Sequence, residues 1–423
     1  MTEVKKNVLR IKLFIMKRRF FVLTLSVFLL GTVKSHAQDP DWVKENTWYF
    51  DNFTKDILSW SIFRETFIGV APEPSGDFDL LFYNLLFKDQ LAAKGHCYGM
   101  DVMAMLMLKN GGYLGYCHPP YMYSGVAGSP ADDTTGPSDA TLRTAIQMVH
   151  GYQINHGFLS FLLDVMAISK SRDGRHSLQQ TEYYLAKNDP PVISITKTVS
   201  PADGGHVVIP YFVKSINATS KRIYVYDPNR SYYEPGLDGK EFYTTGINYI
   251  DVNPITGSWK FNMGTNGAPV YWSGDPGSGG NCIVIPVSVA GKRDRLPQSL
   301  LAEGAYALNT IFIHGDVKIE QLSDVSGKRQ FFNDAGNELE PCEEKRLNNI
   351  LPFTPMDGVP DSKGSVRNTT YFFRGTDPVN IRYKADGAYR IGMIFRGRYI
   401  EVKGVGKGNS QQFLPLELLS KGN

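Results

Sequence analysis

The chain has 423 residues, of which 42% are hydrophobic and 21% are charged, and its formal net charge is +3. This length fits two domains of ordinary size, and the composition is that of a globular protein with enough apolar residues for sizeable cores. The four cysteines exclude a disulfide framework, because such frameworks belong to short chains that are dense in cysteine.

The first 37 residues have the pattern of a secretory signal peptide. A basic region precedes the apolar run at 20–33, and Ser-His-Ala at 35–37 places small residues where a signal peptidase reads them. The apolar run is short for a bilayer span, although an uncleaved N-terminal anchor is the alternative. Translation starts at Met1 or at Met16, which alone would begin a compact signal peptide. We expect a secreted, periplasmic or cell-surface protein with no stable membrane insertion after cleavage.

Removal of this leader reverses the sign of the charge. The rest of the chain has 37 basic and 41 acidic residues, a formal net charge of −4. No basic stripe remains that would favour nucleic acid or an anionic membrane as a partner. The sequence contains no C-x-x-C motif, so a zinc ribbon or a thioredoxin-type site is not supported. The oligomeric state is left open.

The first strong element prediction is a helix at 97–109. Before it, residues 38–95 are rich in aromatic packing residues, and a pro-segment at 38–80 is left open. The segment 97–109 is apolar on nearly every side and ends at Asn-Gly-Gly, 110–112, a good helix stop. A helix that is apolar all round is a buried one. Cys97 is therefore predicted at the first turn of a central, buried helix.

The pattern then changes from helices to strands. Residues 110–137 predict a long surface loop, and further helical segments are predicted up to residue 187. Short β-branched runs follow, at 192–196, 206–213 and 222–226. Helices first and antiparallel strands afterwards predict an α+β domain over 38–290.

A second domain is predicted at 291–423. The stretch 290–297 is charged and ends in proline, which indicates a boundary, and short strand-like runs alternate with turns after it. This spacing predicts a small β-sandwich-like accessory domain, in which we find no catalytic constellation.

Cys97 is the candidate nucleophile. A cysteine reacts as its thiolate, and a helix N-terminus with a neighbouring imidazolium lowers a thiol pKa from about 8.5. Gly95 and Gly99 flank Cys97 and would leave room for a substrate backbone. If Cys97 stays reduced, Cys117, Cys282 and Cys342 cannot all pair within the chain, and their pairing is left open. A lone cysteine near a helix is more often a core residue, so the case depends on its partners.

His206 and Asp227 are the candidate base and orienting acid. His206 follows two glycines at the mouth of one predicted strand, and Asp227 follows the next strand, 21 residues later. A hairpin would set these two ends side by side, so that the acid holds the imidazole in one tautomer. Gly-Gly-His and Asp-Pro-Asn are each common in turns. Their occurrence together with Cys97 in one layout favours a catalytic triad.

Three segments together resemble the papain-like cysteine peptidases over roughly residues 80–290. They are Gly-His-Cys-Tyr-Gly-Met at 95–100, Gly-Gly-His-Val-Val at 204–208 and Tyr-Asp-Pro-Asn at 226–229. The second and third look nearer to the double-glycine, bacteriocin-processing branch, in which Asp followed by Pro is the acid. The resemblance implies a central helix packed on an antiparallel sheet and the triad Cys97, His206 and Asp227.

The resemblance departs from the family at the oxyanion hole. The family places a glutamine six residues before the cysteine, where this chain has Leu91. Gln90, seven residues before, is the oxyanion candidate if the loop absorbs one extra residue, and the Cys97 N–H would be the second donor. Asn229 is the alternative orienting residue, since papain itself uses Asn.

These residues predict an exported thiol hydrolase that cleaves peptide or other amide bonds through a thioester. Its partner is then a peptide or protein substrate, and no metal or organic cofactor is expected. A transglutaminase-like amide acyl-transferase on the same fold is one alternative. A catalytically degenerate papain-like binding or adhesion protein is another, which the displaced Gln90 favours. A metal set of His96, Cys97 and His206 lacks a carboxylate or second cysteine at ligand spacing.

Overall fold

The computed structural model describes one compact unit that begins at Pro40. The described residues are 40–53, 58–91, 95–123, 140–167, 170–199, 205–232, 239–297, 307–335, 338–339, 343–347, 349–353 and 369–413. The predicted signal peptide and part of the predicted loop at 110–137 lie outside them. Among the described helices, none is long and apolar enough to cross a membrane.

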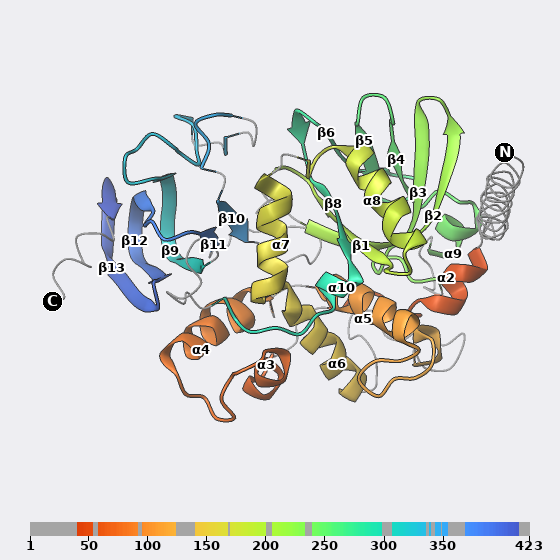
Figure 1. Ribbon diagram of the computed structural model, residues 1–423, viewed down its shortest axis with the longest axis horizontal. Helices are drawn as coiled ribbons and strands as arrows, with labels where there is room; N and C mark the ends of the chain where they lie inside the picture. The colour runs from red at the N-terminus through yellow and green to blue at the C-terminus, as the bar shows by residue number, and fades with distance from the viewer. Residues whose placement is uncertain are drawn as a thin grey trace, which may run out of the picture. The chain divides into compact units, whose positions relative to one another are not determined.

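Helices dominate the described chain before residue 190, as the sequence predicts (Figure 1). The central one is α5 (Cys97–Asn110), which packs against α6 (Ala140–Gly151). The others are α2 (Pro40–Asn46), α3 (Trp60–Thr66), α4 (Asp77–Phe82), η1 (Tyr83–Leu91), η2 (Pro120–Tyr123), η3 (Tyr152–Ile154), α7 (His156–Ala167), α8 (Gly174–Ala186), α9 (Gly239–Thr244) and α10 (Val287–Ala290).

α5 is the buried helix that the sequence predicts. All its residues from Cys97 to Met107 are buried, and it ends where Gly111 adopts a left-handed φ of 67°. Gly99 allows α5 to pack closely against α6, because a Cβ there would collide with the Ile146 carbonyl oxygen. The expectation that Gly99 leaves room for a substrate backbone is therefore wrong.

The strands after α8 form one curled, antiparallel, eight-stranded sheet with the order β7-β6-β5-β4-β3-β2-β1-β8. This confirms the predicted runs at 192–196, 206–213 and 222–226 as adjacent strands. The bounds are β1 (Pro191–Thr196), β2 (Gly205–Asn217), β3 (Ser220–Tyr226), β4 (Tyr249–Val252), β5 (Trp259–Asn262), β6 (Tyr271–Asp275), β7 (Ser278–Gly279) and β8 (Cys282–Pro286).

The side chains of this sheet alternate between two cores. In β2, Val207 and Ile209 belong to the cluster around α5, whereas Val208 belongs to a second cluster with Leu178 of α8. Alternation follows from the period of two in a strand. α5 and α8 therefore pack on opposite faces of the sheet.

A separate five-stranded antiparallel sheet follows, with the order β10-β11-β9-β12-β13. Its Ile311 and Ile313 pack in a cluster with Phe331, whereas Phe312 lies edge-on to Phe82 of α4, with ring centroids 5.6 Å apart. One face thus continues the core around α5. The bounds are β9 (Leu308–Ser323), β10 (Ile350–Phe353), β11 (Thr369–Arg374), β12 (Asn380–Phe395) and β13 (Arg398–Phe413).

The mixed α+β class is confirmed: a helical N-terminal region, a curled eight-stranded sheet and a separate five-stranded sheet. The described strands after residue 307 form one sheet, where a sandwich has two. The boundary near 290–297 and the independence of 291–423 stay predictions.

Candidate functional site

Cys97 is the first residue of α5, as predicted, and its side chain is buried. His96 occupies the N-cap position directly before it. The His96 N–H donates to Asn52 Oδ1 at 2.6 Å, and His96 Nδ1 lies 3.0 Å from the Phe53 carbonyl oxygen. The first turn of a helix favours negative charge, so this position suits a thiolate.

His206 and Asp227 meet at the ends of a hairpin, as the sequence predicts. β2 pairs with β3 so that Ile209 lies opposite Tyr226. His206, near the start of β2, therefore meets Asp227, the residue after β3. The His206 Nε2–H donates to Asp227 Oδ1 over 2.7 Å, and both side chains are almost completely buried.

Asp227 is an ionised, buried carboxylate. Burial raises its pKa, but the charges of His206 and Arg230 and the hydrogen bonds from His206 and the Asn229 N–H outweigh burial and hold the pKa at about 2. Arg230 Nη1 lies 3.3 Å from Asp227 Oδ2, and the Asp227 N–H donates to the Tyr243 hydroxyl oxygen. A fixed negative charge beside an imidazole stabilises the imidazolium that forms when the imidazole acts as a base.

The bond to Asp227 assigns the two nitrogens of a neutral His206. Because Nε2 donates, Nδ1 carries the lone pair that a base needs. Nδ1 is buried and has no hydrogen-bond partner among the described residues. It is therefore the nitrogen that can take a proton.

Two relations connect α5 to the His206–Asp227 pair. The charge of Asp227 reaches Asp101, one turn after Cys97, and contributes to the raised pKa of that acid. The second relation runs through the Asn52 side chain. Its Nδ2 donates to Asn229 Oδ1 at 3.0 Å, and its Oδ1 accepts from the His96 N–H.

Asn229 does not hold the imidazole in the described contacts. Its side chain contacts Asn52, and its backbone N–H donates to Asp227 Oδ1 at 2.9 Å. Asp227, rather than the alternative Asn229, is the side chain hydrogen-bonded to His206.

Gln90 is engaged elsewhere. Its Nε2 donates to the Leu85 carbonyl oxygen at 3.1 Å and to Thr370 Oγ1, on β11, at 2.9 Å. One bond stays within η1, and the other joins η1 to the five-stranded sheet. The structure does not bring Gln90 together with the His206–Asp227 pair.

Asp101 has no ion-pair partner among the described residues. It is fully buried, and neither carboxyl oxygen has a hydrogen-bond partner among the described residues. Burial, and then the charge of Asp227, raise its pKa well above the ordinary value. Burial thus favours the neutral form of Asp101, which lies on the Cys97 face of α5.

Two buried histidines lie against each other beside the start of α5. The rings of His96 and His150 are 4.8 Å apart, and burial and the neighbouring His96 lower the pKa of His150. Within the described residues, no group of three or more His, Cys, Asp or Glu side chains is arranged to hold a metal ion.

The other described cysteines lie apart from this arrangement. Cys117 is exposed, Cys282 is buried, and neither forms a disulfide. Burial raises the pKa of Cys282 to about 12. Cys342 lies outside the described residues, so its pairing stays open.

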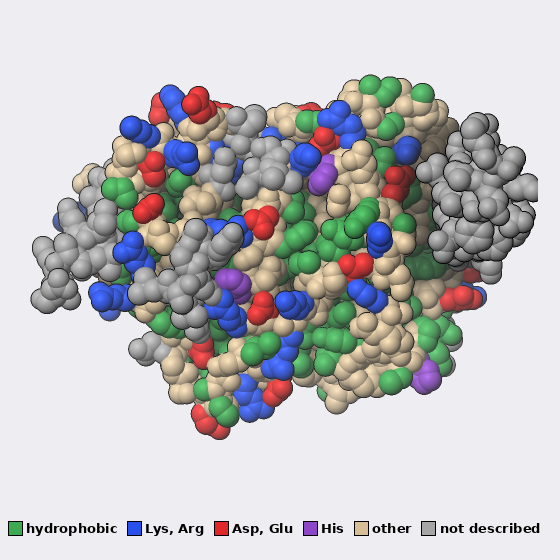
Figure 2. All heavy atoms as spheres, viewed as in Figure 1, with side chains coloured by type: hydrophobic (Ala, Val, Ile, Leu, Met, Phe, Trp, Pro, Cys, Tyr) green, Lys and Arg blue, Asp and Glu red, His purple; other side chains and the backbone are tan. Residues whose placement is uncertain are grey.

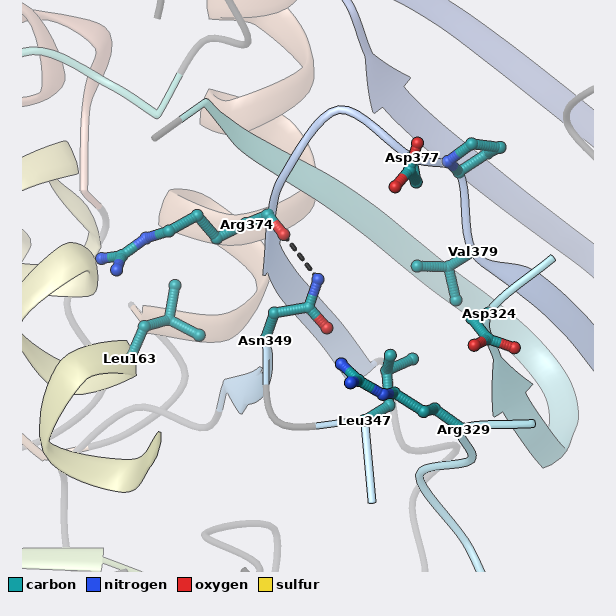
Figure 3. A pocket seen from close by; sticks show the side chains of 9 residues that line it. Leu163, Asp324, Arg329, Leu347, Asn349, Arg374, Asp377 and Val379 are labelled. Carbon is teal, nitrogen blue, oxygen red and sulfur yellow. Dashed lines mark hydrogen bonds between the residues drawn. The ribbon is translucent and has the colours of Figure 1, made fainter. Parts of the chain in front are cut away.

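A pocket of about 430 Å³ lies between α7 and the five-stranded sheet. Figure 3 shows the Arg374 side chain extending toward α7, where it pairs with Asp164 at 2.6 Å, while Arg329 reaches toward Leu347. The pocket shares no lining residue with the Cys97, His206 and Asp227 arrangement. On the face in Figure 2, acidic and basic side chains are interspersed rather than gathered by sign.

Sequence reasoning missed Asn52 and Arg230. Asn52 is 44 residues from His96 and 177 from Asn229, so no local motif marks it. Arg230 follows the Asp-Pro-Asn turn directly, and its position three residues after an acid was the available signal.

Comparison of the chain with models of known protein families, with curated proteins and with solved structures gave no match in any of the three.

Proposed function

We propose that this protein is a thiol hydrolase in which Cys97, His206 and Asp227 act as nucleophile, base and orienting acid. The observation that carries the proposal is the buried 2.7 Å bond from His206 Nε2 to Asp227, which leaves Nδ1 as the basic nitrogen. The position of Cys97 at the start of α5 supports it as well. The finer fold assignment, a papain-like arrangement of helix and sheet, belongs to the same proposal, as does export by the leader.

The reaction follows from these roles. His206 Nδ1 takes the thiol proton, and the thiolate of Cys97 attacks an amide carbonyl carbon to form an S–C bond. The C–N bond then breaks as the imidazolium gives its proton to the leaving amine, and a thioester remains. Water loses a proton to His206 and attacks the thioester carbon, the C–S bond breaks to release the acid, and the imidazolium returns its proton to the sulfur to restore the thiol. Asp227 keeps the imidazole oriented and stabilises its charge throughout.

Access to the nucleophile requires movement. Cys97 and His206 each have 0% exposure, so a substrate carbonyl reaches the sulfur only when covering residues shift. Opening and closing of this kind are common in enzymes and often limit turnover.

A degenerate binding protein is the second candidate, and the position of His206 in its strand favours it. By strand alternation, His206 shares a face of β2 with Val208, which packs in the cluster with α8, whereas Val207 packs in the cluster around α5. The engagement of Gln90 with Thr370 points the same way, because it leaves no side-chain oxyanion donor at the family position.

Acyl-enzyme trapping separates these functions. The full chain is incubated with p-nitrophenyl acetate, and acetylation is mapped by mass spectrometry. The proposal predicts a burst of nitrophenolate and a transient acetyl group on Cys97, both lost in Cys97→Ser and kept in the control Cys117→Ser. With added ethylamine, an N-acetyl product formed in excess of that seen with Cys97→Ser would indicate acyl transfer, whereas acetate alone indicates hydrolysis. Absence of acetyl-Cys97 would overturn the enzyme proposal and favour the binding protein.

A further inference from the structure

We propose that Asn52 is a positioning residue that couples the start of α5 to the loop carrying Asp227. The inference rests on the proposed thiol chemistry of Cys97, and it adds a residue that the three catalytic positions do not include.

Asn52 makes three hydrogen bonds that reach both sides of the site. Its Oδ1 accepts from the His96 N–H at 2.6 Å, and its Nδ2 donates to Asn229 Oδ1 at 3.0 Å. Its own backbone N–H donates to the Pro228 carbonyl oxygen at 2.8 Å. Asn229 in turn donates its N–H to the Asp227 oxygen that accepts from His206. A continuous series of hydrogen bonds therefore runs from the residue before Cys97 to the imidazole.

The chemistry of the bridge requires an amide. The position needs an acceptor toward His96 and a donor toward Asn229, and Asn supplies both from one planar group. A carboxylate would supply acceptors only, and alanine would supply neither. The residue type thus matches the two partners, which lie on segments far apart in the sequence.

The segment that carries Asn52 is itself anchored on both sides. Trp48 Nε1 donates to the Met100 carbonyl oxygen of α5 at 2.9 Å, and Asp51 Oδ1 accepts from the Ser231 N–H at 2.7 Å. The Phe53 ring stacks on the His96 ring with centroids 4.5 Å apart. A bridge held by packed neighbours can fix geometry more precisely than a mobile side chain can.

Loss of the bridge should therefore act on the reactivity of Cys97. His96 precedes the nucleophile directly, so release of its N–H lets the first turn of α5 move relative to Asp227 and His206. Small displacements of reacting groups cost up to about 10²-fold in rate.

The test is the pH profile of Cys97 alkylation by iodoacetamide, followed by peptide mapping. The full chain is compared with Asn52→Ala, Asn229→Ala, the double variant and Asn52→Asp. Asn46→Ala is the matched control, because Asn46 lies in the same part of the chain and bonds only to the Trp42 carbonyl oxygen in the described contacts.

We expect Asn52→Ala to move the midpoint of the profile up by about one pH unit, which is about a tenfold slower reaction at low pH. The rates should converge at high pH, where every thiol is ionised. Asn229→Ala should give a smaller shift, and the double variant should be no worse than Asn52→Ala, because both remove the same bond. Asn52→Asp keeps the acceptor for His96 but loses the donor toward Asn229, so it should restore only part of the rate.

The outcomes separate the two claims. Suppose that the parent has a low midpoint. If Asn52→Ala leaves this midpoint unchanged, or if Asn46→Ala shifts it equally, the positioning role is overturned and the proposed function stands. An ordinary thiol profile in the parent overturns the proposed function and the inference with it. If Asn52→Ala unfolds, Cys97 reacts like a denatured thiol at every pH, and the Asn229→Ala shift then decides.

Discussion

His206 donates to Asp227 across 2.7 Å at a place where neither side chain is exposed to solvent. The hairpin of β2 and β3 brings the two together, and Arg230 and the Asn229 N–H balance the buried charge of the acid. This pair is the best-defined polar feature of the candidate site.

Asp227→Asn should lower p-nitrophenyl acetate turnover by about 10³- to 10⁴-fold, because an amide can turn its NH₂ group to His206 and stabilise the wrong tautomer. The measurement is the steady-state rate at neutral pH per folded molecule. Asp251→Asn is the control, since that acid lies on β4 and accepts from Ser220. Equal rates in the two variants would contradict the role of Asp227.

Asp227 should also make the free energy of unfolding depend on pH under acidic conditions. Its pKa is about 2 in the folded protein against an ordinary 3.8, so the folded state binds fewer protons than the unfolded state in this range. Its contribution of about 2 kcal/mol is present above pH 4 and is lost as pH falls toward 2. Urea unfolding from pH 5 to pH 2 should show this loss in the parent and not in Asp227→Asn. Parallel curves for the two proteins would refute it.

Asp101 should change the free energy of unfolding with pH in the opposite direction. Because burial raises its pKa, the folded protein keeps a proton that the unfolded chain releases above about pH 4. Stability from this group therefore falls as pH rises. Asp101→Asn should unfold like the parent near pH 3 and should be more stable at pH 7, as read from urea midpoints. The measured quantity is the stability of Asp101→Asn minus that of the parent. If this difference were lower at pH 7 than at pH 3, Asp101 would be ionised in the folded protein.

Gly99→Ala should destabilise the protein by about 1–3 kcal/mol through overpacking, because the new Cβ meets the Ile146 carbonyl oxygen of α6. Gly267→Ala is the control, since a Cβ there meets nothing within 4 Å. Thermal unfolding measures both. A Gly99→Ala protein as stable as the control would mean that α5 and α6 separate easily.

Local patterns in the sequence were sufficient for the hairpin and for the central helix. The β-branched runs around residues 206–213 and 222–226 alternate with turns, so His206 and Asp227 fall at neighbouring strand ends. The apolar stretch that ends at Gly111 likewise defines α5. These features depend on neighbours in the chain, which a single sequence contains.

Contacts between distant segments could not be predicted in the same way. Gln90 is paired with Thr370, 280 residues away, so its spacing from Cys97 did not determine its partner. Asn52 lies in a segment whose aromatic composition predicts only packing, yet its amide contacts His96 and Asn229. Tertiary packing decides such pairs, and no repeat or motif marks them.

The most direct measurement of the central claim is the rate of Cys97 alkylation by iodoacetamide against pH, in the parent and in His206→Ala. We predict a rapid reaction at pH 6 in the parent, because His206 and the start of α5 favour the thiolate, and loss of this rapid reaction in His206→Ala. A sluggish thiol that ionises near pH 8.5 in both proteins would contradict the assignment of Cys97 as a nucleophile.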